Sequence, residues 1–328
     1  MAKPTDIRLV AARVYFLPVE TRTPLKFGHE TLTSVTCCRV QVTVCDRTGR
    51  RAVGWGETPL SVQWAWPADL SYHTRLEAMQ RFALRAAESA VASREYGHPI
   101  ELGVSFQEAH LSRLREEAGA RLGPGGEFPY LAALVAISPL DIAVHDAFGQ
   151  LWEIDVYDGY GAEFISRDLA SLFSQPRVAA AELRGRYPDG FLITPPPSQL
   201  PAWHLVGGLD AIDAHDAPPA PAPGDGYPVL LVDWIRRDGL ECLKVKLRGN
   251  DLAWDLHRLT GVAEASFPLG VRRLSADFNC TVSEPRYVIE ILNRLRRDYP
   301  LIFERILYVE QPFPYDLQAH AIDVRDIA

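Results

Sequence analysis

The sequence predicts a protein of two domains, an α+β domain followed by an α/β domain with a parallel sheet. Apolar and polar residues alternate through about the first sixty positions, which is the period of β-strands. From Leu70 the period changes to the three-and-four spacing of helices, and from Leu200 strand-like and helix-like segments alternate. We therefore expect an N-terminal domain at 1–154, a linker or insertion at 155–200, and the α/β domain at 201–328.

Three strands are expected in the first domain. Alternating residues mark Ile7–Val19, Val35–Asp46 and Ala52–Thr58. The segment Arg47-Thr48-Gly49-Arg50, between the second and the third strand, has the composition of a tight turn. The three strands should therefore form a meander.

Helices should follow the meander at about Leu70–Gly123 and again at about Tyr130–Leu151. Within the second stretch, the pair Ser138-Pro139 predicts either a kink or a new helix that begins with Ser138 as its cap. The expected linker contains two short helical patterns followed by three consecutive prolines; the two patterns are Arg167–Phe173 and Arg177–Arg186.

The second domain should consist of βα units, the alternation that is typical of a parallel sheet covered by helices. The expected strands are Ala202–Val206, Leu240–Leu247, Arg273–Phe278 and Arg305–Val309, and the expected helices are Val229–Arg237, Leu252–Ala265 and Pro285–Arg297. The proline-rich stretch 217–223 should be an exposed loop after the first of these strands.

Charge and composition exclude several classes of protein. The 42 acidic residues against 34 basic residues give a net charge of −8, which does not favour nucleic acid as a partner. No apolar run has the length of a signal peptide at the start, or the roughly 20 residues of a membrane span elsewhere. Five cysteines without CxxC spacing indicate reduced thiols. We expect a cytoplasmic protein with no nucleic-acid or membrane partner.

Two lysines should lie on one face of a strand in the second domain. Because strand side chains alternate, Leu240–Leu247 places Cys242, Lys244 and Lys246 together. Strands of a covered parallel sheet are normally apolar on both faces, so the two ammonium groups must be solvated, paired or used in chemistry. Their mutual repulsion should lower the pKa of at least one, as a basic catalyst near neutral pH requires.

Carboxylates recur on the next two strands. Asp277 shares a strand face with Ser275 and Asn279, and Glu310 ends the following strand. The spacing from Lys246 to Asp277 is 31 residues and that from Asp277 to Glu310 is 33, each close to one βα unit of roughly 30 residues. In β/α barrels the catalytic groups lie at the carboxyl ends of the strands. Each residue alone is more often a solvated strand end, but their recurrence in step predicts a shared site.

These segments carry a family resemblance. Lys244-Val245-Lys246, Asp277-Phe278-Asn279 and Val309-Glu310-Gln311-Pro312 resemble the KxK, DxN and EQP strand ends of the enolase superfamily, closest to its muconate-lactonizing and dipeptide-epimerase branch. Arg39–Thr58 resembles the hairpin of the family's capping domain, and Ile137–Leu151 resembles its helix before the barrel. The resemblance implies an N-terminal capping domain followed by the first half of a (β/α) TIM-type barrel, incomplete at its C-terminus.

The resemblance also implies a mechanism. Asp277 and Glu310 would be two of three carboxylate ligands to Mg²⁺, or to Mn²⁺ in its place. Lys246 would be the general acid/base at the α-carbon of a small carboxylate substrate, which could be an acid, an amino acid derivative or a dipeptide. Lys244 would keep the pKa of Lys246 low, and Asn279 would support the metal ligands. The metal would stabilise the negative charge that the substrate gains when the α-proton leaves. The overall reaction would be a racemisation, an epimerisation or a cycloisomerisation.

The loop Pro24–Glu30 occupies the place of the family's specificity loop, which makes Phe27 and His29 the candidate substrate-binding residues. The family's third metal ligand and second acid/base belong to strands beyond the one that ends at Glu310. We therefore expect little turnover from these 328 residues alone, and Mg²⁺-dependent exchange of an α-proton would contradict that expectation. A half barrel exposes two sheet edges and an apolar interior, so we expect association or aggregation unless another chain or the missing part completes it. For the full-length protein we expect a homo-oligomer.

Two other readings of the lysine-bearing strand remain open. Lys246 could form a Schiff base with a carbonyl substrate, as in metal-free aldolases, in which case borohydride would trap the substrate on this lysine. A truncated or catalytically inactive homologue would keep the fold without the chemistry. A glycosidase that uses Asp277 and Glu310 is a weaker alternative because it gives the lysines no role.

Overall fold

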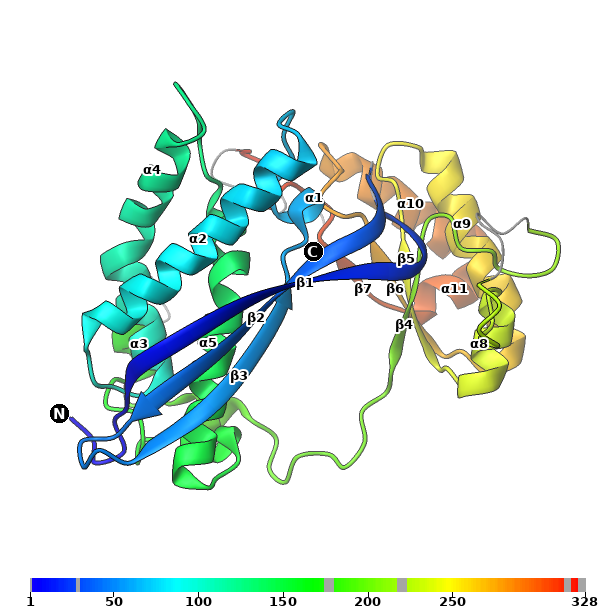
Figure 1. The fold of residues 1–328 in the computed structure, drawn as a ribbon. Helices are drawn as coiled ribbons and strands as arrows, with labels where there is room; N and C mark the ends of the chain where they lie inside the picture. The colour runs from blue at the N-terminus through cyan, green and yellow to red at the C-terminus, as the bar shows by residue number, and fades with distance from the viewer. Residues whose placement is uncertain (1, 28–29, 174–179, 217–222, 316–319, 324–328) are drawn as a thin grey trace. The chain divides into compact units, whose positions relative to one another are not determined.

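The structure is a computed structural model that describes residues 2–27, 30–173, 180–216, 223–315 and 320–323 (Figure 1). The chain forms two units. The first comprises Met1–Val19 and Ser34–Pro197, and the second comprises Glu20–Thr33 and Ser198–Ala328. The tip of the first hairpin therefore belongs to the second unit, although its base belongs to the first.

The first unit begins with the predicted meander. Its sheet has the order β1 (Arg8–Phe27), β2 (Glu30–Cys45) and β3 (Arg51–Pro59), and β2 pairs with β3 in antiparallel register. β1 and β2 are longer than the sequence predicts, because they run on to Phe27 and from Glu30. In the turn before β3, Asp46 accepts hydrogen bonds from the backbone of Thr48 and Arg50, each at 2.9 Å. The meander is confirmed.

Helices follow the sheet, as expected. They are α1 (Val62–Ala65), α2 (Tyr72–Ser93), α3 (Pro99–Phe106), the π-helical turn η1 (Gln107–Leu111), α4 (Ser112–Ala120) and α5 (Tyr130–Trp152). Pro139 lies inside α5, which is one helix, so Ser138 does not begin a new one. The Ser138 hydroxyl instead donates to the Val135 carbonyl and to Thr58 Oγ1.

α5 has the length and hydropathy of a membrane-spanning helix, the one such helix in the described ranges, whereas the sequence was expected to hold no segment of that kind. Half of its residues are buried within the first unit, where they belong to the apolar core. Packing against β3 accounts for this composition, because the glycines Gly54 and Gly56 let the helix backbone lie directly on the strand.

The segment after α5 has little regular structure. It contains η2 (Val156–Gly159), α6 (Leu169–Leu172), α7 (Ala180–Leu183) and η3 (Pro188–Phe191). The two predicted helices are thus single turns, and residues 174–179 lie outside the described residues. Glu101 of α3 holds this segment, because its Oε1 accepts hydrogen bonds from the backbone of Ser166 and Arg167 at 3.0 and 2.8 Å.

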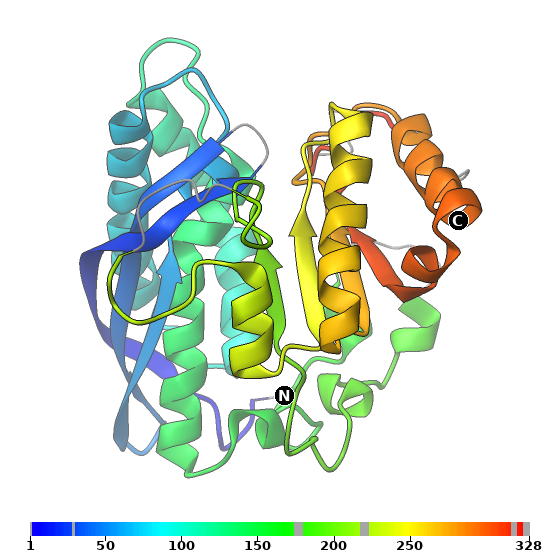
Figure 2. The ribbon, with the colours of Figure 1, turned by 90° about the vertical axis from the view of Figure 1, so that its right-hand side faces the viewer.

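The second unit contains a four-stranded parallel sheet in the order β4-β5-β6-β7. Its helices α8 to α11 lie on one side of the sheet (Figure 2). The elements are β4 (Trp203–Val206), α8 (Leu231–Asp238), β5 (Cys242–Lys246), α9 (Leu252–Ser266), η4 (Phe267–Leu269), β6 (Arg273–Asp277), α10 (Pro285–Asp298), α11 (Pro300–Arg305) and β7 (Ile306–Glu310). The predicted βα order is confirmed, and α11 is an addition. The predicted proline-rich loop lies mostly outside the described residues.

Alternation divides the two faces of β5. Leu243, Val245 and Leu247 are buried in the apolar core of the second unit, whereas Lys244 and Lys246 lie on the opposite face. β7 is the last strand in the sheet order, and its side chains Leu307 and Tyr308 are exposed. An exposed apolar edge strand is the feature that the sequence analysis expected of a partial barrel.

The close contact between β3 and α5 predicts a large effect of Gly54→Ala. A Cβ atom at Gly54 would lie 2.2 Å from the backbone nitrogen of Ala147, so the helix would have to move away from the strand. We expect the free energy of unfolding, measured by urea denaturation, to fall by about 3 kcal/mol. Gly190→Ala is the matched control, because no atom lies within 4 Å of the new methyl group. Equal effects of the two substitutions would show that the contact is looser than described.

His98 predicts an acid-sensitive step in the stability of the first unit. Its Nδ1 accepts a hydrogen bond from the backbone of Ile100 at the start of α3. Burial, together with the nearby His145, lowers the pKa of His98 to about 3. The unfolded chain, with an ordinary pKa near 6.5, then binds more protons than the folded chain between these two values. Stability should consequently fall as the pH falls through this window.

His98→Asn tests this assignment, because asparagine keeps a capping acceptor and does not titrate. We expect the loss of unfolding free energy between pH 6.5 and pH 5 to be smaller in the variant by on the order of 2 kcal/mol. Urea denaturation at a series of pH values measures the difference. Parallel curves for the two proteins would assign the acid sensitivity to other groups.

Candidate active site

Four charged side chains meet where β5, β6 and β7 end. The parallel register aligns Lys246 with Asp277 and Asp277 with Glu310. Lys246 Nζ lies 2.5 Å from Asp277 Oδ2. Lys244 Nζ lies 3.0 Å from the same oxygen and 2.6 Å from Glu310 Oε1. The structure thus brings together the two lysines and two carboxylates that the sequence placed on successive strand ends.

Burial explains why the charges are paired. Asp277 is 1% exposed, and the side chains of Lys246 and Lys244 are 12% and 24% exposed. An isolated ionised carboxylate at such a position would carry a large desolvation penalty, which two ammonium groups offset. The cluster of two positive and two negative groups is therefore neutral as a whole.

Asn279 contacts both Lys246 and Asp277 of this cluster. Its side-chain oxygen accepts a hydrogen bond from Lys246 Nζ at 2.6 Å, and its backbone N–H donates to Asp277 Oδ1 at 2.8 Å. The residue has a φ of 53°, a left-handed conformation that asparagine tolerates better than most residues do. The bend after β6 thus turns the Asn279 side chain back toward the lysine.

The carboxylates also decide the proton affinity of Lys244. Burial, the largest single influence, lowers its pKa, but hydrogen bonds from the ammonium group to Glu310 and Asp277 and the charges of both carboxylates outweigh it. The pKa of Lys244 is therefore raised above its usual range. Repulsion between the lysines was expected to lower the pKa of at least one of them. For Lys244 the contacts with two carboxylates outweigh the effects that lower its pKa.

The hairpin tip lies beside the same edge of the parallel sheet. β4 ends at Val206, and the backbone N–H of Gly208 donates to the carbonyl of Lys26 at 3.0 Å. Nearby, Arg22 pairs with Asp225 at 2.6 and 2.8 Å. Of the two predicted substrate-binding residues, Phe27 is the last residue of β1, and His29 lies outside the described residues.

Arg258 is a residue that the sequence analysis missed. It lies on α9, is buried, and donates from Nη2 to the carbonyls of Gly207 and Asp210 at 2.6 and 2.9 Å. Asp210 in turn accepts a hydrogen bond from the backbone of Gly207. The arginine therefore fixes the loop after β4 that contacts the hairpin tip. A charged residue on the buried face of a helix was the one signal in the sequence.

The donor chemistry of the cluster fits a magnesium ion in part. Asp277 and Glu310 supply carboxylate oxygens on neighbouring strands, and Mg²⁺ prefers oxygen ligands and retains several waters. In the part of the chain that the structure describes, no three His, Cys, Asp or Glu residues are grouped closely enough to hold a metal ion. The described residues thus provide two ligands of the expected kind.

Comparisons with known proteins agree on the fold. No family model and no curated protein matches the sequence. Among solved structures, the dipeptide epimerase of Enterococcus faecalis V583, complexed with Mg and a dipeptide, matches 95% of this chain at 17% identity with a TM-score of 0.50. The L-Ala-D/L-Glu epimerase of Bacillus subtilis matches 95% at 15% identity with a TM-score of 0.52. An enolase from Bradyrhizobium, complexed with magnesium and mandelic acid, matches 96% at 17% identity with a TM-score of 0.51.

The chain therefore has the fold of enolase-superfamily proteins, a capping domain followed by strands and helices of a TIM-type barrel. It spans 63%, 64% and 64% of the three solved chains, respectively, which is less than two thirds of their length. The resemblance inferred from the strand-end motifs is confirmed at the level of the fold.

The buried pairing predicts unequal effects of removing the two carboxylate charges. Asp277→Asn would leave two partly buried ammonium groups short of a counter-charge, and we expect a loss of about 3 kcal/mol or more in the free energy of unfolding. Glu310→Gln removes the more exposed partner, so a loss of about 1 kcal/mol or less is expected. Urea denaturation at neutral pH measures both. A larger loss for Glu310→Gln would contradict the central position of Asp277.

Proposed function

We propose that this chain provides the lysine-bearing face of an enolase-superfamily active site, which removes a proton from the carbon next to a carboxylate with the help of Mg²⁺. Racemisation, epimerisation or cycloisomerisation would follow. The observation that carries the proposal is the alignment of Lys246, Asp277 and Glu310 on three neighbouring strand ends. Salt bridges alone would not require lysines at two positions of one strand on the same face.

Lys246 is the proposed general acid/base. Its ammonium group is held by Asp277 at 2.5 Å and by Asn279 at 2.6 Å, so its position is defined by groups from the neighbouring strand. A base that attacks a carbon acid must be oriented as well as available, and these contacts provide the orientation. Asn279 is thus proposed as a positioning residue for both Lys246 and Asp277.

Asp277 and Glu310 are the proposed metal-holding residues. A bound divalent cation supplies positive charge against the negative charge that develops when the α-proton leaves. In the structure, Lys244 and Lys246 supply the positive charge that neutralises Asp277 and Glu310. Lys244 contacts both carboxylates, and we propose that it offsets the charge of the substrate carboxylate when that group binds. A third ligand and a second acid/base are not assigned to residues of this sequence.

The proposed substrate is a small carboxylate, such as an amino acid derivative or a dipeptide. Two lysines at these strand ends would favour an anionic group once a cation holds Asp277 and Glu310. Phe27 and His29 are proposed as contacts to the rest of the substrate, from their place in that tip. The names of the matched solved structures, which include epimerases bound to dipeptides, support this class.

A Schiff-base lysine is the less favoured chemistry. A Schiff base at Lys246 would leave the aligned carboxylates Asp277 and Glu310 without the metal-holding role that their place on neighbouring strand ends favours. A catalytically inactive homologue would retain the same salt bridges, so only measurement of metal binding separates it from the proposed function.

Metal binding is the direct test. We expect Mn²⁺, followed by the relaxation rate of water protons, to bind the chain at one site, and Glu310→Gln to weaken that binding by about tenfold or more. Glu304→Gln is the matched control, because Glu304 is exposed and lies six residues earlier on α11. Excess Mg²⁺ should compete with Mn²⁺. If Glu310→Gln and Glu304→Gln bind Mn²⁺ equally, the cluster is a structural salt bridge and the proposal fails.

A further inference from the structure

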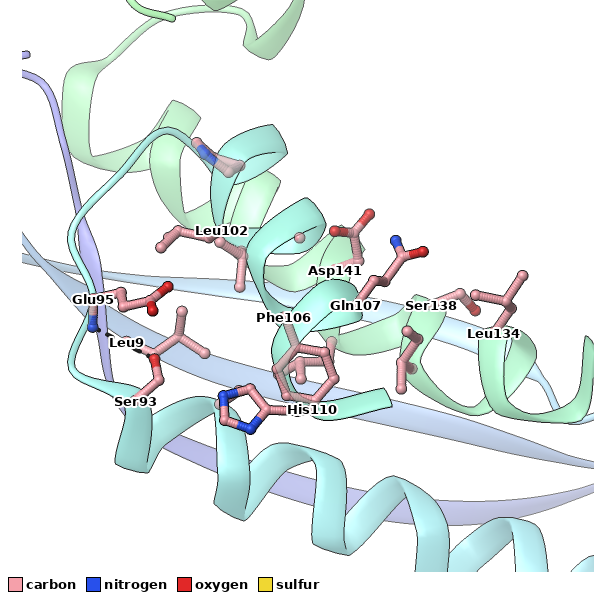
Figure 3. A pocket seen from close by; sticks show the side chains of 16 residues that line it. Leu9, Ser93, Glu95, Leu102, Phe106, Gln107, His110, Leu134, Ser138 and Asp141 are labelled. Atoms are coloured by element: carbon pink, nitrogen blue, oxygen red, sulfur yellow. Dashed lines mark hydrogen bonds between the residues drawn. The ribbon is translucent and has the colours of Figure 1, made fainter. Parts of the chain in front are cut away.

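The first unit contains a cavity that the proposed function does not use. It has a volume of about 170 Å³ and lies among β1, the C-terminal end of α2, α3, η1 and α5 (Figure 3). Its walls are mainly apolar and include Leu102, Phe106, Leu134, Ile137 and Val144. All of its lining residues belong to the first unit, whereas the lysine cluster belongs to the second.

Asp141 places a carboxyl group in this apolar wall. The side chain lines the cavity and is itself exposed to solvent, and it lies so close to Gly103 that a Cβ atom at Gly103 would be 2.9 Å from Asp141 Oδ1. None of the described residues donates a hydrogen bond to this carboxyl group. Burial by the surrounding atoms raises the pKa of Asp141, while the imidazole of His145, one turn further along α5, lowers it. The carboxyl group, which lines the cavity without a protein donor, is therefore open to pair with a cation that enters it.

The carboxylates that line the cavity have no lysine or arginine beside them in the lining of the described chain. Glu95 and Asp141 are acidic, His110 is the one imidazole, and lysine and arginine are absent from the residues that line it in the described part of the chain. Ser138 does not supply a free donor, because its hydroxyl is used by the Val135 carbonyl and by Thr58. A ligand that complements this cavity must therefore bring positive charge together with apolar surface.

A π-helical turn forms one wall of the cavity. η1 (Gln107–Leu111) interrupts the helix between α3 and α4, and Gln107 and His110 from this turn line the space (Figure 3). Such turns are rare and occur frequently at functional sites, because the wider turn re-aims side chains at the expense of regular helix hydrogen bonding. Gln107 lies one turn beyond Gly103, and so on the same side of the helix as the residue against Asp141.

We propose that this cavity binds a small organic cation, a primary ammonium group attached to a single apolar ring. The ammonium group would pair with Asp141, and the ring would occupy the space between Phe106, Leu134 and Val144. The volume fits, since an engineered apolar cavity of about 150 Å³ accepts one benzene ring. The proposal is independent of the lysine cluster and would stand if the proposed function failed.

The test uses 2-phenylethylammonium as the probe and the full 328-residue chain. Isothermal titration calorimetry at pH 7 should give saturable binding at one site, and Asp141→Asn should weaken it by about tenfold, which corresponds to about 1.4 kcal/mol. The uncharged 2-phenylethanol should bind more weakly to the natural chain and change by less than about twofold in the variant. Asp69→Asn, which makes the same chemical change at an exposed position away from the cavity, should leave both affinities unchanged.

A second variant separates loss of the site from loss of the fold. Gly103→Ala keeps the carboxylate but displaces it, so it should also weaken the amine selectively, and near-ultraviolet circular dichroism should report native packing in both variants. Absence of saturable binding to the natural chain would overturn the proposal. Equal binding of 2-phenylethylammonium by the natural chain and by Asp141→Asn would overturn it as well, because the charge would then play no part.

Discussion

The burial of Asp277 is the constraint on which the second unit depends. A carboxylate that is 1% exposed at the end of a sheet strand is tolerated because Lys244 and Lys246 reach it from the neighbouring strand. That arrangement requires a parallel register in which Lys246 and Asp277 are directly paired, and a shift by one residue would turn the lysines into the apolar core. The same requirement brings Glu310 to the site, because β7 continues the register to Asp277.

The loop after β4 connects the parallel sheet to the hairpin tip through hydrogen bonds. Arg258 on α9 donates hydrogen bonds to the carbonyls of Gly207 and Asp210, and the backbone N–H of Gly208 donates to the carbonyl of Lys26. The contacts join three segments that are far apart in the sequence. For the proposed chemistry, the consequence is that a backbone hydrogen bond from Gly208 to Lys26 anchors the hairpin tip beside the strand ends that carry the charged side chains.

Much of the fold was predictable because local patterns and long-range packing agree. The alternation in β5 predicted both the buried set Leu243 and Val245 and the lysine face, and the spacing of about one βα unit predicted that Asp277 and Glu310 would join it. Boundaries were less predictable. α11 was missed because Pro300–Arg305 is too short to show a helical period. Of the two alternatives at Ser138-Pro139, the new helix start was wrong, because packing on β3 stabilises α5 as one helix.

The sequence by itself determined the order of most strands and helices, which face of β5 is apolar, and which charged residues stand at strand ends, because these follow from side-chain period along the chain. Only the tertiary structure decided that the carboxylates raise the pKa of Lys244, that Glu20–Thr33 joins the second unit, and that a carboxyl group at Asp141 opens into an apolar cavity. Each of these depends on distances between segments separated by tens to hundreds of residues, and a linear pattern does not encode such distances.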